Sequence, residues 1–137
     1  MTVFVLGTYD VRTIKFTAAQ LGLTTTLVGL GTVVDLVDEL PVGWSVKEVQ
    51  IRLDGTITSA GGTTVANVGT SDDAGLDNIV NALDIEGVAG WATVTTTRQE
   101  ITSTPKKIQA QVETATAAPT AVAGLTFEVV LTKVDRE

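Results

Sequence analysis

The sequence contains no histidine and no cysteine among its 137 residues. The chain therefore cannot form disulfide bonds or Ser–His and Cys–His nucleophile systems, and a zinc or copper site would lack its commonest ligands. Two phosphate-binding signatures, G-x-x-x-x-G-K-[ST] and G-x-G-x-x-G, are also missing. We therefore expect that the protein is not an enzyme and that it uses no cofactor.

Aromatic and basic residues are scarce as well. The three Phe, two Trp and one Tyr are too few to line a glycosidase-type cleft and also fill a core, so a carboxylate-pair hydrolase is the least favoured alternative. Nine Lys and Arg face 16 Asp and Glu, which gives a net charge of −7. Because nucleic-acid affinity is built from clustered basic side chains, we expect no nucleic-acid partner.

Charge is nearly absent from the first 34 residues, which carry only Asp10, Arg12 and Lys15. Residues 16–34 form an uncharged run long enough to consider a membrane span, but threonines, glycines and Gln20 dilute its hydrophobicity. No short apolar stretch of the signal-peptide kind follows the first basic residue. We expect no membrane partner; a sheet or another chain would cover this apolar surface instead.

What the sequence has in excess is β-branched residues, with 24 Thr and 20 Val. These side chains favour strands over helices, and 13 glycines supply turns. Strict alternation of apolar and polar residues marks half-buried strands at 40–58, 106–115 and 125–134. Further strands are expected at 8–18, 27–37 and 92–97, and 63–69 is expected to form a hairpin with 40–58. The prediction is an all-β, antiparallel two-sheet sandwich or jelly roll.

The stretch "GTSDDAGLDNIV" (69–80) holds three aspartates, Asp72, Asp73 and Asp77. Apolar residues in "LDNIVNAL" recur at i, i+3, i+4 and i+7, which predicts one short helix over about 72–84, with Asp72 and Asp73 at its N-terminus and Asp77 on its solvent face. A weak calcium site is the alternative. It is disfavoured because calcium loops place carboxylates at alternating positions and end in Glu, whereas Leu83 is the twelfth residue here.

Trp44 and Trp91 each follow a turn. A bulky ring in that position commonly caps a sandwich core, and we expect this of both. A subunit interface or a sugar-stacking site are the alternatives, and the latter requires an exposed ring.

Residues 40–134, about 70% of the chain, resemble small β-sandwich structural proteins of tailed-bacteriophage virions. The matching segments are "PVGWSVKEVQIRLDG", "SAGGTTVANVGTSDDAGLDNIVNALDI" and "KKIQAQVETATAAPTAVAGLTFEVVLTKV". The resemblance implies a capsid decoration (cement) protein on the outer surface of the virion head. Its partners would be the major capsid protein and copies of itself in a homo-oligomer, for which a trimer is the candidate. It implies no catalytic residues.

Residues 1–35 do not follow this pattern, which leaves a head-spike, fibre-base or tail position open, as well as a carbohydrate-binding or host-adhesion module. We expect the chain to divide into an interface-forming N-terminal arm with the first strands (1–35) and a β-sandwich (36–137). Such an arm can pair with a neighbour by strand addition. The residues expected at the subunit interface are Phe4, Tyr9, Phe16, Leu21, Leu23 and Leu27.

Overall fold

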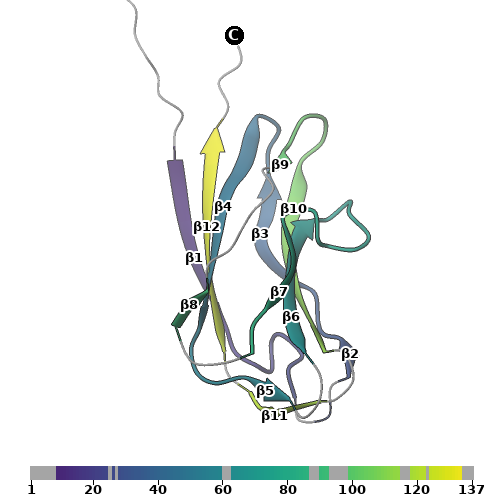
Figure 1. The fold of residues 1–137 in the computed structure, drawn as a ribbon. Helices are drawn as coiled ribbons and strands as arrows, with labels where there is room; N and C mark the ends of the chain where they lie inside the picture. The colour runs from purple at the N-terminus through teal and green to yellow at the C-terminus, as the bar shows by residue number, and fades with distance from the viewer. Residues whose placement is uncertain are drawn as a thin grey trace, which may run out of the picture.

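The computed structural model describes residues 9–24, 26, 28–59, 63–86, 90–92, 99–114, 118–122 and 124–133 (Figure 1). Every regular element in these ranges is a β-strand, which confirms the prediction of an all-β fold. In the same ranges no helix is long and apolar enough to span a membrane.

The strands form two five-stranded antiparallel sheets that face each other, and a third, two-stranded sheet lies at one end (Figure 1). Sheet A has the order β1 (Tyr9–Phe16), β12 (Leu125–Lys133), β4 (Trp44–Leu53), β8 (Gly90–Ala92), with β9 (Gln99–Glu100) also on β4. Sheet B has the order β2 (Gly29–Leu30), β10 (Lys106–Thr114), β6 (Thr64–Thr70), β7 (Val80–Asp84), with β3 (Val34–Leu40) also on β10. The small sheet pairs β11 (Pro119–Ala121) with β5 (Thr58–Ser59).

The inner strands bury the residues that alternation predicts. On β12, Leu125, Phe127, Val129 and Leu131 are at most 2% exposed, while the residues between them face away from the core. The alternating apolar residues of β4 and β10 are buried in the same way, at 6% exposure or less, namely Val49, Ile51, Leu53, Ile108, Ala110 and Val112. These side chains belong to one apolar cluster between the two sheets, so the sandwich prediction is confirmed.

The described part of the expected arm is built into the sandwich. β1 pairs with β12 along its whole length, from Tyr9 opposite Thr132 to Phe16 opposite Leu125. After β1 the chain turns, and Leu21 and Leu23 enter the core. The arm is therefore not a free extension in residues 9–24, and the expected boundary at residue 35 does not coincide with a break in either sheet.

The expected hairpin between 40–58 and 63–69 is wrong. β4 belongs to sheet A and β6 to sheet B, so the connection between them crosses from one layer to the other. Both strands bury apolar side chains against the opposite sheet, and the sequence pattern of a strand is the same whichever neighbour it pairs with.

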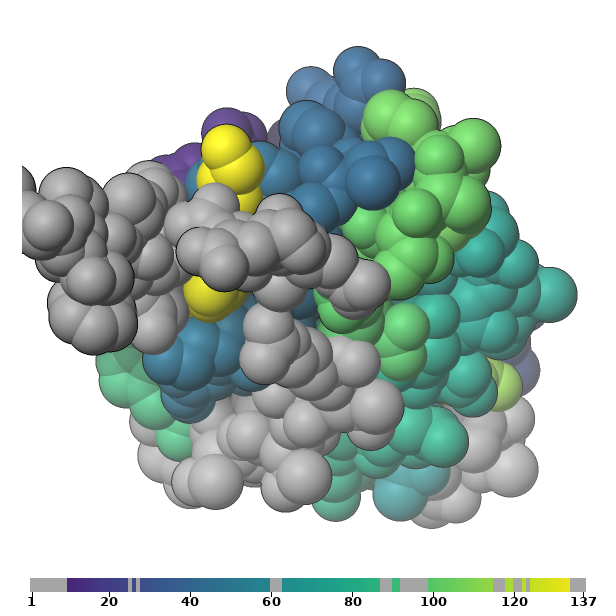
Figure 2. Space-filling view, turned by 90° about the horizontal axis from the view of Figure 1, so that it is seen from above, coloured from purple at the N-terminus to yellow at the C-terminus, as the bar shows by residue number. Residues whose placement is uncertain are grey.

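At the opposite end of the sandwich, Gly43 in the β3–β4 turn donates its N–H to Ile101 O at 2.9 Å, and the end-on view shows these two segments side by side (Figure 2).

The expected helix over about 72–84 is also wrong. Residues 71–79 form consecutive turns, and 80–84 form β7. Leu76 has a positive φ of 51°, which breaks a right-handed helix. The Asp73 carboxylate accepts the N–H groups of Asp77 and Asn78, which in a helix would bond to backbone carbonyls. Ile79 and Val80 are still buried, so the apolar spacing predicts their burial correctly. It does not predict the backbone conformation.

We predict that Phe127→Ala lowers the free energy of unfolding by about 3–5 kcal/mol, because the fully buried ring leaves a cavity between the sheets. The matched control is Val130→Ala on the same strand, whose half-buried side chain faces away from the core and should cost about 1 kcal/mol or less. Chemical denaturation of both variants checks this. Equal losses for the two variants would contradict the assigned faces of β12.

Candidate functional site

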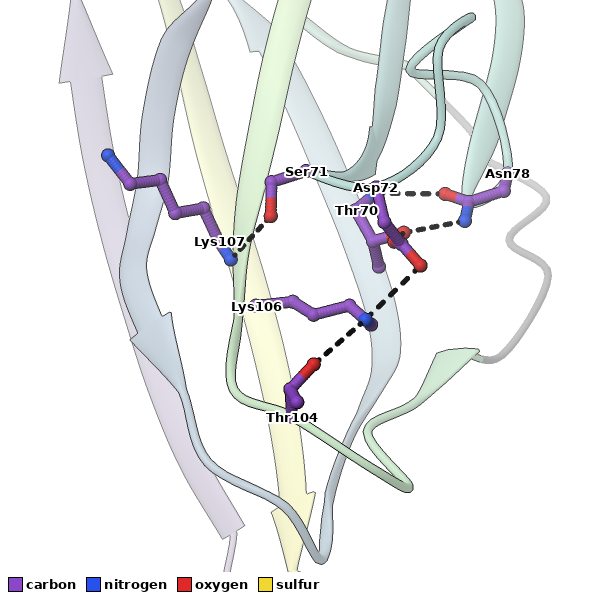
Figure 3. Close-up of polar contacts among 7 residues, drawn as sticks. All are labelled: Thr70, Ser71, Asp72, Asn78, Thr104, Lys106 and Lys107. Atoms are coloured by element: carbon purple, nitrogen blue, oxygen red, sulfur yellow. Dashed lines mark hydrogen bonds and ion pairs between the residues drawn. The ribbon is translucent and has the colours of Figure 1, made fainter.

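The loop between β6 and β7 holds the three aspartates of the acidic stretch and folds back on the end of β6. Asn78 anchors it: its Oδ1 accepts from Thr70 N at 2.9 Å, and its Nδ2 donates to Thr70 Oγ1 at 2.8 Å (Figure 3). Gly69 permits the close approach, since a Cβ there would lie 2.6 Å from the backbone of Leu76. The local sequence thus specifies a tight loop.

The loop is also tied to the start of β10. Asp72 accepts from Thr70 Oγ1 at 2.6 Å and forms an ion pair with Lys106 Nζ at 3.2 Å (Figure 3). Ser71 and Lys107 exchange two bonds: Ser71 N donates to Lys107 O at 3.0 Å, and Lys107 N donates to Ser71 Oγ at 3.1 Å. Asp72 is therefore a structural residue that joins two neighbouring strands of sheet B.

Asp73 holds the turn together from inside the loop. Its Oδ2 accepts the backbone N–H groups of Asp77 at 2.8 Å and of Asn78 at 3.0 Å. The Asp77 N–H in particular lowers the pKa of Asp73, because an N–H donor favours the charged carboxylate. Among the described residues no three acidic side chains are grouped so that they could hold a metal ion. The geometry thus gives these aspartates a role in the loop itself.

The carboxylates with altered acidity are all poor proton donors at neutral pH. The pKa of Asp72 is lowered chiefly by the Thr70 hydroxyl and by Lys106. The pKa of Asp35 on β3 is lowered by its bonds to Gln109 at 2.8 Å and to Lys107 at 3.1 Å. General acid catalysis requires the opposite shift, toward the working pH. Neither group is suited to acid chemistry.

The six residues expected at a subunit interface lie in different environments. Phe4 and Leu27 lie outside the described residues, and Tyr9 begins β1. Phe16 is half-buried and makes an edge-to-face contact with Phe127, with ring centroids 6.2 Å apart. Leu21 and Leu23 are 0% and 2% exposed within the chain's own core, so they offer no surface to a partner.

Sequence reasoning missed the apolar side chains that are in fact exposed. Val28, Leu30 and Val33 are 56%, 64% and 42% exposed on and beside β2, and we call these three residues the β2 ridge. Val11 on β1 is 55% exposed. The signal lies in "VGLGTV" (28–33), where the glycines beside the apolar residues have no side chains that could cover them.

Trp44 and Trp91 have different environments. Trp44 is partly buried and packs on the core, as expected. Trp91 is 53% exposed, so its expected core position is wrong. It lies opposite Arg52 in the β4–β8 pair, and the guanidinium sits 5.7 Å from the ring centroid. Directly opposed residues of an antiparallel pair share a face, so Trp91 lies with Arg52 on the side of sheet A that faces away from the core.

A pocket of about 240 Å³ opens where the edge of β1 meets the β3–β4 end of the sandwich. Val37, Leu40 and Leu131 give it an apolar floor, and each of them is at most 3% exposed. Asp10, Arg12 and Glu39 are the charged residues of its lining. Arg12 Nε lies 3.2 Å from Asp10 Oδ2.

No protein-family model matches this chain, and no curated protein matches it in sequence. Solved structures do share its fold. A chain in the acidic stable capsid structure of Helicobacter pylori bacteriophage KHP30 aligns with a TM-score of 0.55 and 17% identity, over 93% of this chain and 89% of that one. A chain in the capsid asymmetric unit of cyanophage Pam1 aligns with a TM-score of 0.63 and 21% identity, over 98% and 91%.

We predict that Asp73→Asn makes the free energy of unfolding less dependent on pH. A carboxylate whose pKa is lowered by folding stabilises the native state above its unfolded pKa of about 3.9, and this contribution is lost as the pH falls through the lower folded value. The stability difference between wild type and variant should therefore be largest near neutral pH and shrink below about pH 4. Denaturation series at several pH values check this, with the exposed Asp38→Asn as control. A constant difference across the range would contradict the assignment.

We also predict that calcium produces no tight, stoichiometric heat in a calorimetric titration, because the aspartates already serve the loop. Binding that vanishes in Asp72→Asn would restore the calcium interpretation.

Proposed function

We propose that this chain is a structural protein of a bacteriophage virion, and more specifically a capsid decoration (cement) protein that binds the outside of the head. The observation that carries the proposal is the fold shared over nearly the whole length of chains from two phage capsids. The partners are then the major capsid protein and further copies of this chain, and the location is the virion surface.

The chemistry of the described surface supports a role in contact rather than in catalysis. The carboxylates of the acidic loop serve the loop's own hydrogen bonds, and those with shifted pKa values stay ionised at neutral pH. A cement protein requires only area and complementarity, because many weak contacts repeated over a shell add up to firm attachment.

The β2 ridge is the surface that we assign to the shell. Three apolar side chains are exposed within six positions, and β2 lies at the end of the sandwich opposite the β3–β4 turn (Figure 1). Exposed apolar side chains that are grouped in this way are typical of protein–protein contacts, since burying them removes apolar area from water.

The test uses heads of the phage that encodes the chain, assembled without it. Wild-type protein should sediment with these heads saturably and raise the temperature at which they break open. Leu30→Asp should weaken binding about tenfold or more, because it places a charge in the apolar contact. Val42→Asp, at the other end of the sandwich and 47% exposed, is the matched control and should bind normally.

Saturable binding to purified tails or head fibres, with none to heads, would replace the cement role by a tail, spike or fibre-base role. Absence of binding to any virion part would overturn the proposal.

A glycan-binding or host-adhesion module is the second candidate, and the exposed ring of Trp91 beside Arg52 is the observation that favours it. Exposed aromatic rings can stack on sugars. Quenching of tryptophan fluorescence by members of a glycan panel, lost in Trp91→Ala and retained in Val42→Ala, would support this role over attachment to the head.

A further inference from the structure

Among the described residues, strand β1 lies at one edge of sheet A. In the described part of the chain its only strand partner is β12, so the backbone groups on its other side are not paired within a sheet (Figure 1). The register with β12 fixes which side chains face where. Val11 lies opposite Val130 on the outer face of sheet A, whereas Asp10 lies opposite Leu131 and faces inward toward the pocket.

The sequence of β1 is self-complementary in one antiparallel register. When two copies pair about a two-fold axis at Val11, each residue i meets residue 22 − i of the other copy. Val11 then meets the partner copy's Val11, and Asp10 and Arg12 meet each other reciprocally, so an apolar pair is flanked by two pairs of opposite charge. Directly opposed residues of this kind stabilise a sheet.

Two-fold axes at three other residues of β1 give worse pairs. An axis at Thr13 sets Arg12 against Ile14 and Asp10 against Phe16, which pairs charges with apolar side chains. An axis at Arg12 or at Lys15 sets like charges directly opposite each other, which is destabilising. Charged side chains on an edge strand usually block pairing, but with the axis at Val11 each of Asp10 and Arg12 meets the opposite charge.

We propose that the outer edge of β1 is a self-association surface, at which two copies join their A sheets antiparallel about a two-fold axis at Val11. The pairing covers Val11, whose side chain is 55% exposed. It also brings the partner's arginine to the pocket, whose charged lining has two acids, Asp10 and Glu39, and one base, Arg12. The side-chain exposures of 53% for Arg12 and 46% for Asp10 leave both available for exchange.

A disulfide trap tests the register, and the chain suits it because it contains no cysteine. Directly opposed residues in an antiparallel pair have Cα atoms about 4.5–5.5 Å apart, which is within disulfide range. Val11→Cys should therefore form a covalent dimer under mild oxidation. Thr13→Cys is the matched control on the same face, because the two copies of that residue would be separated by about 13 Å along the strand. Equal or faster cross-linking of Thr13→Cys would overturn the register.

Charge reversal tests whether the pairs between Asp10 of one copy and Arg12 of the other hold the two copies together. The readout is the sedimentation of the uncross-linked protein. Wild type should be a dimer at concentrations on the order of 10 µM. Asp10→Arg alone places like charges opposite each other and should weaken self-association about tenfold or more. The double variant Asp10→Arg/Arg12→Asp restores opposite pairs and should recover the dimer. A wild-type monomer or trimer, or a double variant no better than the single one, would overturn the proposal.

Self-association through β1 rests on the proposed function, in which copies of this chain are partners. The β1 contact and the cement role can nevertheless fail separately. Asp10→Arg leaves the β2 ridge intact and, as a monomer, should still sediment with heads. A wild-type protein that dimerises through β1 but binds no virion part would retain this surface and overturn the cement role.

Discussion

The structure depends on one layer of apolar side chains held between two sheets. The inner strands β4 and β12 of sheet A and β6 and β10 of sheet B bury residues that are close to 0% exposed, among them Ile51, Phe127, Val68 and Val112. No disulfide is available to hold the layers together. Removal of apolar area from water must therefore supply most of the favourable free energy, offsetting the entropy lost when the strands become ordered.

This constraint decides where the chain can interact. Because the inward-facing residues of the inner strands are committed to the core, surface for partners remains on the outer faces, at the edges and at the ends of the sandwich. The exposed features described above lie at the edges and ends: the outer edge of β1, the β2 ridge, and Trp91 on the short strand β8. A β-sandwich can thus carry separate contacts for copies of itself and for a shell, since the edge and the end do not compete for the same residues.

Alternation of apolar and polar residues is enough to predict β4, β10 and β12 and their buried faces, because a half-buried strand requires it whatever its neighbour. Pairing could not be predicted in the same way. The hairpin assigned to 40–58 and 63–69 failed because alternation is identical for two strands of one sheet and for strands in facing sheets. Leu21 and Leu23 were assigned to an interface because an uncharged stretch shows that apolar surface must be covered, without showing that the covering comes from the same chain.

The acidic loop shows why local sequence can be read in two ways. The spacing of Leu76, Ile79 and Val80 fits a helix, yet Leu76 and Ile79 are buried from a series of turns and Val80 from the start of β7. Asp73 accepts the N–H groups of Asp77 and Asn78, which a helix would bond to backbone carbonyls, and Asn78 accepts from Thr70 N at the end of β6. The same hydrogen bonds engage the side chains of Asp73 and Asn78 in the structure of the loop. By joining β6 to the start of β10 through Ser71 and Lys107, the loop fixes the relative position of two inner strands of sheet B. A protein that acts through the shape of its surface requires that kind of rigidity, because an edge or ridge recognises its partner only while the strands behind it hold their register.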